Sequence, residues 1–95
     1  MRIDWTPIAK LGWQEVADYI HKEFGDKALL EFEKRTYDAE KDISEMPNSG
    51  SIAWFDSEEN VLYRFKHIYR RSKMLYFVLD NKIFIADFWD VRSNY

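Results

Sequence analysis

The apolar residues of this sequence change their spacing at Gly50, and this change limits the fold more than any other feature. Before Gly50 they recur every three or four positions in two stretches, 7–24 and 26–46, which is the period of an amphipathic helix. After Gly50 they form short runs bounded by polar turns, as strands do, at 51–55, 61–68, 73–79 and 82–89. A further short alternation at 2–5 predicts a strand before the first helix.

The ends of the predicted helices carry recognisable signals. Thr6 can cap the first helix, and Pro7 suits its first position because the proline ring fixes a helical φ. Gly25 is placed to end that helix, and we expect Asp26 to cap the second one. Pro47 then disfavours a helical conformation in the residue before it, so the second helix stops there.

These elements predict the order β-α-α-β-β-β-β, an α+β fold of two layers in which a helical hairpin covers one face of a sheet. The last two strands are expected to be joined by a tight turn at Asp80-Asn81. The length fits a single domain over residues 1–95. The large side chains expected between the two layers are Trp13, Ile20, Phe32, Leu75 and Ile85.

Composition excludes several kinds of site. The sequence has no cysteine, which excludes disulfides and thiolate metal sites. Neither His21 nor His67 has a second ligand at a suitable spacing, so we expect no metal and no cofactor. No apolar run resembles a signal peptide or reaches the length of a membrane span. We therefore expect a cytoplasmic protein without a membrane partner.

The charge is unevenly distributed along the chain. The formal net charge is −3, but residues 1–60 carry a balance of −7 and residues 61–95 a balance of +4. Much of the positive charge lies in the stretch Tyr63–Tyr76, where basic and aromatic residues alternate. A strand, a turn and a second strand on an exposed sheet face would present this charge to a polyanion, either RNA or an acidic peptide.

The order of elements, the TP pair that opens the first helix and the P..G spacing that follows the second resemble the toxins of the RelE/ParE superfamily. The segment SKMLYFVLDNKIFIADFWDVR is similar to the central hairpin of that family, and the resemblance spans essentially the whole chain. The resemblance implies a curved antiparallel sheet with two helices on its convex side. It also implies a toxin of a type II toxin–antitoxin pair that a cognate antitoxin neutralises.

The resemblance implies one of two targets. RelE-like members cleave mRNA in the ribosome without a metal, as endoribonucleases, whereas ParE-like members inhibit DNA gyrase and are not nucleases. Cleavage of RNA requires fixed positive charge at the phosphorane and groups that transfer protons. By family register, the residues at the catalytic positions would be Arg64, Lys66, Lys73, Arg92 and Tyr95.

Two of these positions depart from the ribonuclease pattern. Lys73 stands where those members carry an arginine, and a lysine lacks the bidentate fork that binds a phosphorane tightly. Tyr95 is the last residue of this sequence, where a proton-transfer group is poorly held. Arg70 and Arg71, at the expected turn, either contact nucleic acid or are plain surface charge.

Other interpretations of the same residues stay open. Arg64 and Lys66 can equally lie on a solvated sheet face, and His67 is expected to pack or to be half-exposed rather than to act in catalysis. Asp87 either faces solvent or a partner, or pairs with a base such as Lys66 or Lys73.

Three functions therefore remain: an mRNA interferase that depends on the ribosome, a ParE-like gyrase inhibitor, and an inactive toxin-fold protein that only binds partners. Apolar residues that lie off the helical stripes predict a surface for a partner protein such as the antitoxin. These residues are Leu11, Leu30 and Tyr37.

Overall fold

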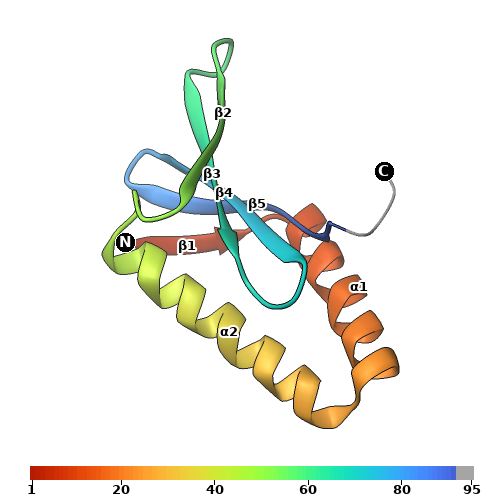
Figure 1. Ribbon diagram of the computed structural model, residues 1–95. Helices are drawn as coiled ribbons and strands as arrows, with labels where there is room; N and C mark the ends of the chain where they lie inside the picture. The colour runs from red at the N-terminus through yellow and green to blue at the C-terminus, as the bar shows by residue number, and fades with distance from the viewer. Residues whose placement is uncertain (92–95) are drawn as a thin grey trace.

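The computed structural model describes residues 1–91 of the chain. Its elements follow the predicted order β-α-α-β-β-β-β (Figure 1). They are β1 (Arg2–Trp5), α1 (Pro7–Phe24), α2 (Asp26–Glu45), β2 (Ser51–Asp56), β3 (Val61–His67), β4 (Ser72–Leu79) and β5 (Lys82–Asp90).

The strands form one sheet in the order β1-β5-β4-β3-β2. Strands β2 to β5 make an antiparallel meander, as predicted. Strand β1 instead pairs with β5 in parallel, with Ile3 opposite Ile83 and Trp5 opposite Ile85. The sequence prediction left the direction of the first strand open, and the structure places it parallel to the last strand, at the edge of the sheet.

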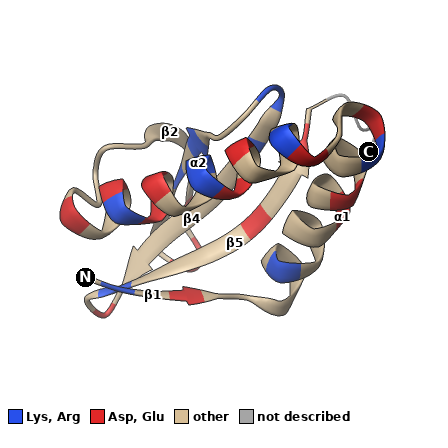
Figure 2. Ribbon diagram, turned by 90° about the horizontal axis from the view of Figure 1, so that it is seen from below, with Lys and Arg blue, Asp and Glu red and all other residues tan. Residues whose placement is uncertain are grey.

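Both helices cover the same face of the sheet, which we call the helix-bearing face; the opposite one is the open face (Figures 1 and 2). Charged residues of both signs follow one another along the outer side of α2, as expected for a solvated helix (Figure 2). The largest side chains buried between the two layers are Phe32, Ile20 and Ile43 from the helices and Tyr76, Phe88, Met74, Ile83 and Ile85 from the sheet.

The predicted core is mostly confirmed. Ile20, Phe32 and Ile85 are buried in it, and Trp13 is half-buried, with its ring stacked on Phe32 at 5.3 Å. Leu75 is also buried, but it lies between Met74 and Tyr76 in β4 and therefore points to the open face. The prediction that Leu75 packs between the layers was wrong.

Helix α1 begins as the sequence indicates. The Thr6 hydroxyl accepts a hydrogen bond from the backbone N–H of Ala9 at 3.2 Å and donates one to the carbonyl of Ile85 at 2.9 Å. The cap therefore also fixes the start of the helix to β5. Gly25, with φ of 89°, both ends α1 and precedes α2, so Asp26 is the first residue of α2 and not its cap.

Helix α1 crosses the sheet very closely at Gly12. A Cβ at this position would lie 2.1 Å from the backbone carbonyl oxygen of Phe88, so no side chain fits between the helix and β5. At Phe88, strand β5 is paired with Met74 of β4, whereas its pairing with β1 ends at Ile85.

The hairpin of β2 and β3 extends beyond the helices, and we call residues 51–67 the arm (Figure 1). At the other end of β3, the turn to β4 lies close to the junction of the two helices. Here the guanidinium of Arg70 covers the ring of Phe24 at 3.7 Å. Within residues 1–91, neither helix is long and apolar enough to cross a membrane.

Candidate functional site

The basic stretch Tyr63–Tyr76 folds as predicted into a strand, a turn and a second strand, but its cations lie on two different faces. Arg64 is opposite Tyr76 and Lys66 is opposite Met74, and both of these partners are buried beneath the helices. Arg64 and Lys66 therefore share the helix-bearing face. Lys73 precedes Met74 and is opposite His67, so it lies on the open face. The expectation that the whole stretch lies on the exposed sheet face was wrong for Arg64 and Lys66.

Arg64 holds the loop that joins α2 to β2. Its Nη1 donates hydrogen bonds to the carbonyl of Gly50 at 2.9 Å and to that of Asn48 at 3.2 Å. Within residues 1–91 no carboxylate pairs with Arg64. The residue is thus committed to the loop backbone through one end of its guanidinium, and its charge is not neutralised.

The hydroxyl of Tyr76 also forms hydrogen bonds with the loop that joins α2 to β2. It donates to the carbonyl of Pro47 at 2.7 Å and accepts from the N–H of Gly50 at 2.9 Å. Burial raises the pKa of Tyr76, although the hydrogen bond from Gly50 and the charge of Arg64 act in the opposite direction. The hydroxyl is therefore a neutral structural group at physiological pH, and it is not poised for proton transfer. A small hollow of about 90 Å³ adjoins it and is lined by Asn48, Leu62, Arg64, Tyr76, Phe77 and Val78.

The open face carries a row of aromatic rings across four strands, which we call the aromatic ladder. Trp54 and Tyr63 stack at 4.7 Å, Tyr63 meets the edge of Phe77 at 5.1 Å, and Phe77 stacks on Phe84 at 5.2 Å. Trp54 at one end is half-exposed. Lys82 at the other end is held by Asp4 at 3.2 Å and lies over Phe84 at 5.6 Å. Such a surface suits an apolar or aromatic partner better than a phosphate.

Lys73 is the predicted site residue that does lie on the open face. Its Nζ sits 4.4 Å from the centre of the Phe65 ring, and Trp89 is its cross-strand partner in β5. Lys66, two residues from Arg64, makes no contact with Lys73 because it points to the opposite side of the sheet. The structure therefore keeps the candidate catalytic cations apart.

Arg70 and Arg71 lie in the β3–β4 turn. Arg70 has a φ of 55°, and its guanidinium lies over Phe24 and, at 5.4 Å, over Tyr69. Its carbonyl also contacts the Nε2 of His67, so His67 is tied to the turn. Arg71 is exposed, and its carbonyl accepts the backbone N–H of Val91 at 2.7 Å. Arg70 is thus engaged in holding the turn, and the Arg71 side chain forms no ion pair within residues 1–91.

Asp87 does not pair with a base in the part of the chain that the structure describes. Its Oδ1 accepts the backbone N–H of Phe88 at 2.8 Å, next to the irregular register where β4 and β5 shift. Of the two earlier alternatives, the ion pair with Lys66 or Lys73 is absent. Arg92 and Tyr95, the other two residues expected at the site, lie outside the described residues.

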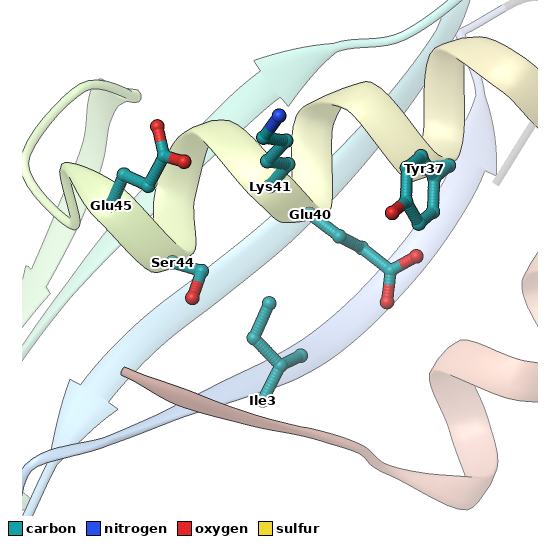
Figure 3. A pocket seen from close by; sticks show the side chains of 6 residues that line it. All are labelled: Ile3, Tyr37, Glu40, Lys41, Ser44 and Glu45. Atoms are coloured by element: carbon teal, nitrogen blue, oxygen red, sulfur yellow. The ribbon is translucent and has the colours of Figure 1, made fainter.

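A second hollow lies between β1 and α2, on the edge of the molecule (Figure 3). It measures about 270 Å³ and is lined by Ile3, Tyr37, Glu40, Lys41, Ser44 and Glu45. Two contacts bridge it: the indole N–H of Trp5 donates to Glu40 at 2.9 Å, and the amino group of Met1 donates to the carbonyl of Ser44 at 3.0 Å. The exposure of Tyr37, like that of Leu11 and Leu30, is as predicted. Residues 1–91 contain no cluster of side chains able to bind a metal ion.

The sequence did not reveal the aromatic ladder as a surface. Tyr63, Phe65 and Phe77 resemble core residues in an alternating strand, and only the register shows that they face away from the helices. The residue that could have indicated this surface is Trp54. It is a large aromatic side chain in an edge strand that the helices do not reach, and it is exposed.

The fold is similar to that of a chain in a solved structure described as the chromosomal ParDE TA system from P. aeruginosa. The two chains share 18% sequence identity, the superposition covers 95% of each, and the TM-score is 0.71. No protein-family model and no curated protein matches the sequence. The near-complete coverage includes the helical hairpin, the meander and the parallel first strand. The chain therefore has the fold of the RelE/ParE-type toxins.

Proposed function

We propose that this protein is the toxin of a type II toxin–antitoxin pair and that it inhibits growth by binding a protein target, in the manner of the ParE-like gyrase inhibitors. The toxin role is supported by the fold, which matches a chain of a ParDE TA system over 95% of both chains. The partner that this role requires is a cognate antitoxin, and both act in the cytoplasm.

The separation of the cations favours the binding mechanism over RNA cleavage. Stabilising a phosphorane requires several donors aimed at the same point. Arg64 and Lys66 lie on the helix-bearing face, and Lys73 lies on the open face. Since the sheet lies between them, these three residues cannot contact one phosphate.

Arg64 is further unsuited to a transition state because it already bonds two carbonyls of the α2–β2 loop. Moving it to a substrate would break contacts that hold the fold. The open face instead offers the aromatic ladder, and aromatic rings are enriched where proteins bind other proteins. A protein target such as gyrase fits this face better than a ribosome-bound mRNA.

The test has two stages. The first expresses the chain from an inducible promoter in a bacterial host, with and without the product of the neighbouring gene. We expect growth to stop when the chain is made alone and to continue when the two are made together. Normal growth after production of the isolated, folded chain would exclude the toxin role.

The second stage separates the two targets. Purified protein is added to gyrase supercoiling reactions and, separately, to ribosomes that carry a defined mRNA. We expect supercoiling to be inhibited and the mRNA to stay intact. If the mRNA is cut, and if Lys73→Ala abolishes the cutting while the fold is retained, the protein is an endoribonuclease and the binding mechanism is wrong.

A further inference from the structure

The arm has a free strand edge with an apolar surface. Strand β2 is the last strand of the sheet and pairs only with β3, so the backbone groups of its outer side have no strand partner within residues 1–91. Its side chains Ile52, Trp54 and Phe55 are 62%, 50% and 55% exposed. Unpaired apolar edges of this kind readily accept another strand.

A bulge in β2 gives this edge an unusual pattern. The register with β3 shifts between Ile52 and Trp54, so that Ile52 is opposite Arg64 whereas Phe55 is opposite Leu62. Arg64 and Leu62 are two residues apart and share a face, and Ile52 and Phe55 therefore share that face as well. Two apolar side chains thus lie on the same side of one short strand, with Ala53 and Trp54 between them.

Charge is divided between the two ends of the arm. Its tip carries Asp56, Glu58 and Glu59. The Asp56 carboxylate accepts hydrogen bonds from the backbone N–H groups of Glu58 at 3.0 Å and Glu59 at 3.2 Å. The carboxylates of Glu58 and Glu59 are exposed. Its base carries Arg64 and Lys66. Neither cation is paired with a carboxylate in the described part of the chain.

We propose that β2 pairs in antiparallel fashion with β2 of a second copy of this chain, around a twofold axis between Ala53 and Trp54. This register places Ile52 directly opposite Phe55 of the partner subunit, and the symmetry repeats the pair. Ser51 faces Asp56 of the partner subunit, so no like charges oppose each other along the strand. The two aromatic ladders then meet at Trp54 and continue across both copies.

The charges of the arm fit this arrangement. An antiparallel pairing brings the acidic tip of one copy beside the basic base of the other, and it does so twice. Adjacent strands lie about 4.8 Å apart, so Lys66 and the tip of the other copy are separated by about two strand spacings, which long side chains span. A parallel pairing would instead set tip against tip and base against base.

The dimer should be weak, because one pair of short strands buries less than the roughly 1,200 Å² of a standard interface. We expect a dissociation constant in the micromolar range or above. Sedimentation velocity over a series of concentrations measures it, since the mass rises from the 11.6 kDa of one chain toward twice that value. The proposal does not rest on the toxin role, and this measurement is independent of growth or gyrase assays.

Charge exchange tests the register itself. The tip variant combines Glu58→Lys with Glu59→Lys, and the base variant is Lys66→Glu. The dissociation constant of each variant dimer should be at least about tenfold higher than that of the wild type. Because of the twofold symmetry, each substitution brings like charges together at both ends of the pairing. Mixing the two variants restores opposite charges at both ends and should yield a heterodimer tighter than either homodimer.

The controls use exposed residues away from the arm. Glu23→Lys with Glu33→Lys changes the net charge as the tip variant does and should leave dimerisation unchanged. Phe55→Lys should abolish dimerisation without unfolding the chain, as judged by circular dichroism, because Phe55 is half-exposed. A wild type that stays monomeric at all concentrations, or a dimer unaffected by Phe55→Lys, or a variant mixture no tighter than its parts, would overturn the proposal.

Discussion

The contact that should respond most clearly to a single substitution is the Tyr76 hydroxyl beneath the α2–β2 loop. It donates to Pro47 at 2.7 Å and accepts from Gly50 at 2.9 Å, and both Tyr76 and Gly50 are buried. Tyr76→Phe removes only the oxygen, so it opens almost no cavity. It leaves a buried N–H and a carbonyl without their partner.

The magnitude follows from these two bonds. Each hydrogen bond contributes about 0.5–1.5 kcal/mol net, and a buried group left unpaired costs about 1–3 kcal/mol. We therefore expect Tyr76→Phe to lower the free energy of unfolding by about 2 kcal/mol. For a domain of this size, 1 kcal/mol corresponds to about 4–8 °C, so the melting temperature should fall by roughly 8–16 °C.

Urea unfolding followed by tryptophan fluorescence and by far-UV circular dichroism measures the change. Tyr37→Phe is the matched control, because the Tyr37 side chain is exposed and no hydrogen bond holds its hydroxyl in the described residues. The control should stay within about 0.5 kcal/mol of the wild type, as surface substitutions usually do. If Tyr76→Phe is equally harmless, the hydroxyl does not hold the loop and the reasoning is wrong.

Three further predictions concern the α2–β2 loop and the packing of the helices. Arg64→Ala should lower the free energy of unfolding by about 1–2 kcal/mol, because two loop carbonyls lose a charged donor; urea unfolding measures it, and unchanged stability would return Arg64 to the candidates for a target contact. Burial raises the pKa of Tyr76 above 10.0, so the folded state holds this proton more tightly than the unfolded chain. Stability should therefore fall as the pH rises above about 10 through the raised pKa, and Tyr76→Phe should remove that part of the fall in a pH series of urea midpoints. Trp13→Ala should cost about 2–4 kcal/mol, because the indole stacks on Phe32 and donates to the Thr36 hydroxyl at 3.0 Å; a melting temperature equal to that of the wild type would contradict the packing of the helical hairpin on the sheet.

The local features of the fold could be predicted because they depend on short stretches of sequence. Thr6 and Pro7 mark the start of α1, and Gly25 adopts the positive φ that ends it. Asp80 and Asn81 have φ of 52° and 59°, as a two-residue hairpin turn of the primed type requires. Each of these signals acts through its own backbone and needs no distant partner.

The faces of the strands could not be predicted with the same success. In β3 the aromatic residues look like the set that faces the helices, but they lie on the open face and the cations lie on the helix-bearing face. Both sets are half-buried. Arg64 can lie on the helix-bearing face because the carbonyls of Asn48 and Gly50 accept its hydrogen bonds there. In β4, the consecutive burial of Met74, Leu75 and Tyr76 hides the strand period altogether.

The candidate site depended on these faces, so it was predicted less well than the fold. The family register located Lys73 on the open face of the sheet, but it grouped Lys73 with Arg64 and Lys66, which the sheet separates. Spacing along one strand fixes which residues share a side of that strand. It does not fix which side meets the helices, because that depends on where the helices end.

The parallel pairing of β1 with β5 has a consequence for how the chain acquires its structure. The helical hairpin and the meander form from neighbouring segments, whereas Ile3 pairs with Ile83, 80 positions later. Closing such a long loop is entropically costly, and contacts of this separation slow the approach to the native state. During synthesis β1 must wait until residues 82–85 have left the ribosome, and the Thr6 cap, which also bonds to Ile85, waits with it. A nascent chain that stops before β5 thus leaves its first strand unpaired and the start of α1 unanchored.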